Sequence, residues 1–372
     1  MGVAMYWIVV AAVVILGAVM PQHGRKRIYY IGTMAVLHAL VSGLRYRYLT
    51  GDMMSYERVF LTSRNLSFFD DFLLNEGINT GYYWFSKVIA GLTNSDYQMF
   101  IMIIAIIIEA AVAIMVYKHS PLPWVSYLVW NCMSFYIFGF NAMKQSLAMA
   151  FVMLAMIAVL ENRFGRFLLF TLIGGFVHFP AFAFLPAYWI AKAKIRPLTI
   201  LCYIVAALVI FRFQTPIVEF VTDIYYEEGE MLLADSAALG GRFKMMVVIL
   251  VMGVCLKGFA DRRFEKTFNM MVVAAIFQMF SGFDNVFTRF ADYYFQISIL
   301  FLPMMVSSPA TDPRLGGSSK TAIFRFNKRS LKAIAVCMAV YLVWYYYRTC
   351  LGATIVYEVD NYLNYRSMWY LK

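Results

Sequence analysis

The residues of this sequence that are best suited to chemistry are cations, a histidine and a carboxylate at the ends of apolar segments. Arginine matches phosphate oxygens bidentately and lysine binds them as a point charge, so these cations suit an anionic ligand. A histidine or an aspartate beside them could act as a general base. The candidates are Arg45, Arg47, Lys144, Gln145 and Arg289 for binding, and His178 and Asp52 for catalysis, with Arg242 and Lys244 as further cations.

The composition predicts that a lipid bilayer surrounds the elements that hold these residues. Of the 372 residues, 62% are hydrophobic and 14% are charged, whereas a soluble domain has roughly a quarter charged residues. The apolar residues form blocks that approach the ~20 residues needed to cross the hydrocarbon core as a helix. Residues 3–20 lack a basic start and a small-residue cleavage site, so we expect a retained span and not a signal peptide.

Ten apolar segments are expected to cross the membrane, and the basic residues between them predict the orientation. The net charge of +11 lies in short loops, which is typical of cytoplasmic loops and not of a nucleic-acid-binding face. The expected spans are residues 3–20, 28–44, 97–117, 122–140, 142–160, 198–213, 245–256, 268–280, 297–306 and 333–351. The expected cytoplasmic groups are Arg25-Lys26-Arg27, Lys118-His119, Arg163 with Arg166, Lys192-Lys194-Arg196, Arg262-Arg263 with Lys266, and the basic loop 308–332.

This orientation places residues 45–96 and 214–244 outside the cell. Residues 167–190 begin and end beside basic loops, so this segment should return to its starting side. Gly174-Gly175 and His178-Phe179-Pro180 interrupt its middle and predict a break there. Within the first outside segment, residues 66–74 (LSFFDDFLL) place Phe68, Phe69, Phe72 and Leu73 on one face, which predicts an interfacial amphipathic helix.

The same orientation places the candidate cations on the outside, where cations are normally rare. Each has a structural alternative: the arginines could extend to lipid headgroups, and Lys144-Gln145 could mark a helix start. His178 could be bonded only to a neighbouring helix, and Asp52 could belong to a turn. Glu109, deep in an apolar segment, is better explained as a structural acid. The shared side of the cations is the stronger argument, and a substrate with phosphate groups would compensate their charge.

Four stretches, in their order and spacing, resemble the EpsG family of polytopic exopolysaccharide and capsule polymerases, which are Wzy-like. They are GLRYRYLTGDMMSYERVF (43–60), NTGYYWFSKVIAGLTNSDYQMFIMIIAIII (79–108), FGFNAMKQSLAMAFVMLAM (138–156) and GGFVHFPAFAFLPAYWI (174–190), with a weaker echo in TRFADYYFQISILFLP (288–303). The family's Arg-Gln pair is Lys144-Gln145 here, which keeps the charge but lacks the bidentate fork.

The resemblance implies a single all-α integral membrane domain, a polytopic helical bundle of about 10–12 transmembrane helices with broken or re-entrant segments, similar to GT-C-type membrane glycosyltransferases. It implies a polymerase that joins undecaprenyl-diphosphate-linked oligosaccharide units at the outer face of the bacterial cytoplasmic membrane, in exopolysaccharide, capsule or O-antigen synthesis. The cations would stabilise the diphosphate leaving group, and His178 or Asp52 would be the base. Tyr56 joins the substrate-binding candidates; together with Tyr48, Tyr82 and Tyr83 it could stack on sugars, although an aromatic belt at the interface explains most of them.

Expected partners are the polyprenyl-diphosphate-linked donor and acceptor and membrane lipids, without nucleic acid, and with no cofactor or metal. The resemblance also allows contacts with other glycan-assembly proteins, such as a flippase or a chain-length regulator. Two other functions stay open: a transporter or flippase of lipid-linked glycans, and a membrane acyltransferase that modifies a polysaccharide. A transporter would favour charges at the midplane and repeated halves; Glu109 is almost alone at depth and no repeat is visible. The five cysteines are expected to be packed thiols.

Overall fold

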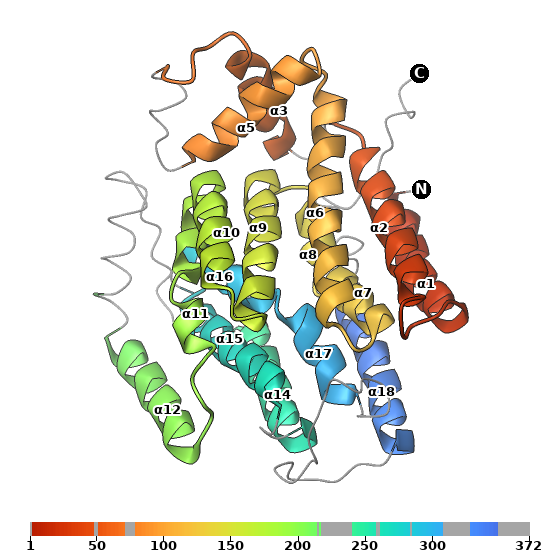
Figure 1. Cartoon of the computed structure of the whole chain (residues 1–372), viewed down its shortest axis with the longest axis vertical. Helices are drawn as coiled ribbons and strands as arrows, with labels where there is room; N and C mark the ends of the chain where they lie inside the picture. Colours follow the sequence, from red (N-terminus) through yellow and green to blue (C-terminus); the bar gives the residue numbers. More distant parts are fainter. Residues whose placement is uncertain are drawn as a thin grey trace.

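The structure of the chain, a computed structural model, is a bundle of α-helices (Figure 1). It describes residues 2–47, 51–70, 79–213, 216, 240–257, 261–282, 285–307 and 328–348. These residues form helices and loops with no β-strand among them, which confirms the all-α prediction. Two of the described helices, α6 (Tyr97–His119) and α9 (Met143–Leu160), are long and apolar enough to cross a membrane, judged by length and composition.

Helix α9 lies at the centre of the bundle, because nearly all of its side chains are buried. It packs against α6 and against α10 (Phe164–Val177). Its C-terminus is closed by Asn162, whose φ of 60° is the left-handed conformation that asparagine tolerates. The Arg163 N–H donates to the Ala158 carbonyl at 2.8 Å, so the turn into α10 satisfies the last carbonyls of α9.

Most of the other helices coincide with the expected spans. They are α1 (Gly2–Val19), α2 (Arg27–Gly43), α12 (Pro197–Arg212), α14 (Gly241–Lys257), α15 (Arg262–Met279), α17 (Ser298–Val306) and α18 (Lys328–Tyr346). Large apolar side chains point away from the bundle on several of them, among them Ile8 at 58%, Leu208 at 62% and Val340 at 65% exposure. Exposed apolar faces on many helices are unusual for a surface in water and suit a lipid environment.

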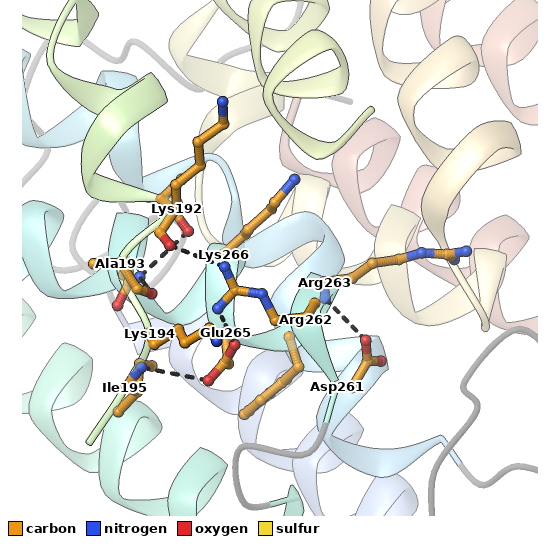
Figure 2. Close-up of polar contacts among 12 residues, drawn as sticks. Lys192, Ala193, Lys194, Ile195, Asp261, Arg262, Arg263, Glu265 and Lys266 are labelled. Atoms are coloured by element: carbon orange, nitrogen blue, oxygen red, sulfur yellow. Dashed lines mark hydrogen bonds and ion pairs between the residues drawn. The ribbon is translucent and has the colours of Figure 1, made fainter. Parts of the chain in front are cut away.

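The basic loops meet at one end of the bundle, which we call the basic end. Arg27 donates to the Tyr117 and Ser120 carbonyls, and Lys118 pairs with Glu161 at 2.8 Å. The buried Lys266 donates to the carbonyls of Val159 and Leu160 and to Asn162 Oδ1. Figure 2 shows the continuation of this end, where Arg262 donates to the Lys192 carbonyl at 2.9 Å and pairs with Glu265. In the described part of the chain these loops therefore meet at one end, while their location on the cytoplasmic side stays a prediction.

The segment 167–190 breaks and returns, as the two interruptions predict. Helix α10 ends at His178, whose backbone is extended, and the chain reverses through the 3₁₀ helix η1 (Phe179–Phe184) into α11 (Ala187–Ile190). The Tyr188 hydroxyl donates to the Asn162 carbonyl at 3.2 Å, and the Phe164 and Tyr188 rings lie 5.1 Å apart. The end of the segment therefore lies beside its beginning, at the basic end.

Two expectations are wrong in detail. Residues 122–140 are not one continuous span: Ser134 has a φ of 69° and separates α7 (Pro123–Cys132) from the short α8 (Phe135–Phe138). Residues 66–70 form turns and no interfacial helix, because Phe68 and Phe69 pack on Trp84, whose indole N–H donates to the Phe68 carbonyl. Residues 71–74 lie outside the described part of the chain.

The opposite end of the bundle, which we call the site end, is covered by α3 (Gly51–Ser63) and α5 (Thr80–Leu92), as Figure 1 shows. Helix α16 (Asn285–Phe295), which the sequence did not delimit, also reaches toward it and packs against η1. Of the other two predicted loops, 308–327 and all of 214–239 except residue 216 lie outside the described residues.

Candidate functional site

Lys144 stands in the first turn of α9, at the site end, among three tyrosine rings. Its Nζ lies 6.0 Å from the ring centroid of Tyr56, 5.9 Å from that of Tyr82 and 5.6 Å from that of Tyr83. Tyr56 comes from α3, and the other two rings come from the first turn of α5. An ammonium group within about 6 Å of a ring face is attracted by the ring quadrupole, so these helices position the cation that the sequence singled out.

The N-terminus of α9 adds a second positive element at the same place. Its N-cap residue, Ala142, has no side chain that could accept from the first N–H groups of the helix, and these groups carry the positive end of the helix dipole. One backbone hydrogen bond joins Lys144 to the Tyr56 hydroxyl. Burial and the nearby Asp52 raise the pKa of Tyr56 to about 12, against the effects of this hydrogen bond and of Arg289. Tyr56 therefore stays neutral at physiological pH.

His178 faces the same cluster from the break between α10 and η1. Its Nδ1 lies 2.7 Å from the hydroxyl of Tyr293, and its side chain is buried. Arg289 and Lys144 are near enough for their charges to act on the ring. We use the name Lys144 cluster for the residues assembled here: Tyr56, Tyr82, Tyr83, Lys144, His178 and Arg289.

Helix α16 supplies several of these groups from one of its faces. Arg289, Asp292 and Tyr293 follow the i, i+3, i+4 spacing that brings side chains together on a helix. Asp292 is buried; it pairs with Arg242 of α14 and accepts from Gln145 Nε2 at 3.4 Å. Gln145 thus links the start of α9 to α16, while the Arg242 guanidinium lies over the Phe295 ring.

Asp292 and Tyr293 are functional candidates that the sequence interpretation missed. The signal was present in the stretch TRFADYYFQISILFLP, where an acid and two tyrosines follow Arg289 within one helical turn and a half. Their partners, His178 and Gln145, are 115 and 147 positions away in the chain. Such distances leave no local pattern to detect.

Arg45 and Arg47, by contrast, are occupied by contacts of their own. Arg45 is 1% exposed, donates to the Ser42 carbonyl at 2.6 Å and to the Gly139 carbonyl at 3.4 Å, and lies 5.1 Å from the Phe140 ring centroid. These contacts tie the end of α2 to the turn before α9. Arg47 pairs with Glu57 of α3 at 3.5 Å. Their predicted roles as substrate ligands stay predictions.

The remaining polar candidates have simpler surroundings. Asp52 is exposed on α3, one turn before Tyr56. Glu109 is buried and accepts from the Trp130 indole at 3.1 Å, as expected of a structural acid. Within the described ranges, no group of three His, Cys, Asp or Glu side chains could hold a metal ion, and Cys132, Cys202, Cys255 and Cys337 are free thiols.

Comparison with known protein families agrees with the motifs. A model of the EpsG family matches residues 28–314, which is most of the chain and includes every residue of the Lys144 cluster. Comparisons with curated proteins and with solved structures found no match. The matched family is one of polysaccharide polymerase-like membrane proteins. The predicted resemblance is confirmed, and this chain belongs to the EpsG family.

Proposed function

We propose that this protein is a polysaccharide polymerase that spans the bacterial cytoplasmic membrane several times and joins undecaprenyl-diphosphate-linked repeat units at its outer face. The observation that carries the proposal is the convergence of Lys144, Arg289 and the N-terminus of α9 beside His178. Two cations and a helix N-terminus together favour a ligand with several negative charges. A diphosphate on a lipid carrier has that charge and leaves as an anion when a sugar is transferred.

The arrangement suggests how the transfer proceeds. The hydroxyl oxygen of the acceptor unit bonds to the anomeric carbon of the growing chain, while the bond from that carbon to the diphosphate oxygen breaks. The electron pair leaves on the diphosphate, whose charge Lys144 and Arg289 stabilise as it develops. The acceptor proton passes to a base, for which the buried His178 is better placed than the exposed Asp52. The two side-chain cations supply the charge, so the proposal requires no resident metal.

The location of the site supports the side of the membrane that the proposal requires. The basic end carries the cluster of cations expected of cytoplasmic loops, and the Lys144 cluster lies at the opposite end of the bundle, beneath α3 and α5. Single cysteines test this in a variant whose five native cysteines are replaced by serine: Arg58→Cys on α3 and Arg166→Cys at the start of α10, both exposed positions. A membrane-impermeant maleimide added to intact spheroplasts should label position 58 and spare position 166. The reverse pattern would exclude transfer at the outer face.

The reaction itself is tested by single substitutions of Lys144, Arg289 and His178 to alanine. Each variant should insert into the membrane at normal levels, abolish long glycan chains and cause single lipid-linked units to accumulate. Arg58→Ala, which removes an exposed cation of α3 at the same end, is the matched control and should leave chain length unchanged. Long chains in all three cluster variants would refute the site. Acylated sugars without chain growth, detected by mass spectrometry, would point to an acyltransferase.

A further inference from the structure

His178 and Tyr293 form a buried hydrogen bond between the η1 break and α16. The Tyr293 hydroxyl lies 2.7 Å from Nδ1 of His178, and Tyr293 has no exposed surface. In an imidazole ring the partner of one nitrogen decides the tautomer and the role of the other nitrogen. With Nδ1 held by Tyr293, Nε2 is the nitrogen left for a substrate.

The backbone around His178 is fixed independently of this contact. The His178 N–H donates to the Gly174 carbonyl and its own carbonyl accepts from Ala181, both at 2.9 Å. These bonds set the position of its Cα between α10 and η1 but leave the rotation of the ring about its side-chain bonds undetermined. The hydroxyl of Tyr293 adds the hydrogen bond that favours one direction of the buried ring.

Helix α16 is well placed to hold that hydroxyl still. The next residue, Tyr294, donates its hydroxyl to the Ala183 carbonyl of η1 at 2.8 Å, and its ring lies 4.9 Å from the Phe184 ring. Two consecutive buried tyrosines of α16 thus bind the same returning segment. Tyr294 bonds a backbone carbonyl and anchors η1 to α16, whereas Tyr293 bonds the ring of His178 and orients it.

We propose that Tyr293 is a positioning residue that holds His178 as an Nε2 base. This inference rests on the proposed polymerase function. The Nδ1–H of the ring donates to the Tyr293 hydroxyl oxygen, and the lone pair of Nε2 faces the acceptor sugar. As the acceptor oxygen bonds to the anomeric carbon and the diphosphate leaves with the electron pair, Nε2 takes the hydroxyl proton. The bond to Tyr293 then stabilises the ring that carries both protons.

The test compares two substitutions that each remove one buried hydroxyl from the same helix, Tyr293→Phe and Tyr294→Phe. Purified protein in proteoliposomes is given lipid-linked repeat units isolated from the producing strain deleted for this protein. Tyr293→Phe should lower kcat by about 10- to 100-fold, as the loss of a residue that orients a catalytic group does, with KM unchanged within about threefold. Tyr294→Phe should lower the melting temperature but leave kcat within about threefold of the wild type.

A double-mutant cycle with His178→Ala shows whether Tyr293 acts through the histidine. If it does, Tyr293→Phe should cause no further loss in the His178→Ala background. A further loss of tenfold or more in that background would overturn the proposal, as would equal kcat values for the two tyrosine variants. If His178→Ala keeps full activity while Lys144→Ala and Arg289→Ala lose it, the positioning role fails and the diphosphate site stands. If none of these variants loses activity, the proposed function fails as well.

Discussion

Replacing Gly81 with alanine should disturb the Lys144 cluster through the backbone alone. Gly81 stands at the start of α5, where that helix crosses the end of α10. A Cβ at this position would lie 2.7 Å from both the carbonyl carbon and the carbonyl oxygen of Phe176. Ordinary contact begins at 3.4 Å, so the two helices must move apart by about 0.7 Å. The obstacle is backbone, so no side-chain rotation can relieve the overlap.

The displacement should affect activity more than stability. Overpacking of this kind costs roughly 1–3 kcal/mol, which the bundle can absorb. Tyr82 and Tyr83 follow Gly81 directly, however, and they form two of the three rings around Lys144. A misplacement near 1 Å in a catalytic arrangement can lower the rate by about 100-fold. We therefore expect kcat/KM to fall by about 10- to 100-fold in Gly81→Ala.

The assay is chain growth in proteoliposomes, with the melting temperature measured on the same preparations. Gly91→Ala is the matched control, because it lies on the same helix and a Cβ there meets no atom within 4 Å. That variant should be fully active and gains helix propensity of up to about 1 kcal/mol. Equal activity of the two alanine variants would show that the position of α5 relative to α10 does not control the site, and the reasoning would fail.

Three further predictions concern charge. Burial raises the pKa of Glu161, but the Lys118 hydrogen bond and the neighbouring cations lower it overall. The wild type should therefore be more stable to unfolding than Glu161→Gln by about 1 kcal/mol near neutral pH. This difference in stability should vanish as the pH falls through the lowered pKa of Glu161. Arg242→Met should cost about 3–5 kcal/mol by leaving the buried Asp292 carboxyl without its ion-pair partner, and Asp292→Asn should restore most of it, as thermal melts would show. Inorganic diphosphate should raise the melting temperature of the wild type and not of Lys144→Met, less so at high salt.

The sequence was sufficient to predict that the basic loops gather at one end, because charge and hydrophobicity act locally. Each basic loop could be assigned to one side without knowing its partners, and the structure joins Arg27, Lys118, Arg262 and Lys266 at a single end. The return of residues 167–190 was likewise visible, since two glycines and the Phe179-Pro180 step cannot sustain a helix.

The details that the sequence did not reveal depend on contacts between distant segments. Residues 66–70 have the pattern of an amphipathic helix, but the Trp84 ring and its N–H provide a better partner for a turn. Helix α16 has no long apolar run, so it could not be recognised as an element. The contact of Arg45 with the Gly139 carbonyl, 94 positions away, could not be foreseen either, and its role as a phosphate ligand stays a prediction.

Convergent positive charge makes the Lys144 cluster the place where an anionic substrate is expected. At the basic end, Lys118 meets Glu161 and Arg262 meets Glu265; at the site end, Arg242 meets Asp292. Each of these cations has a carboxylate within a short distance, so its charge is balanced by the fold. Lys144 lies among three tyrosine rings, and Arg289 and the start of α9 add positive charge close by. Cations that converge beside a helix N-terminus favour an anion there, so a diphosphate bound at the Lys144 cluster would be stabilised by all three.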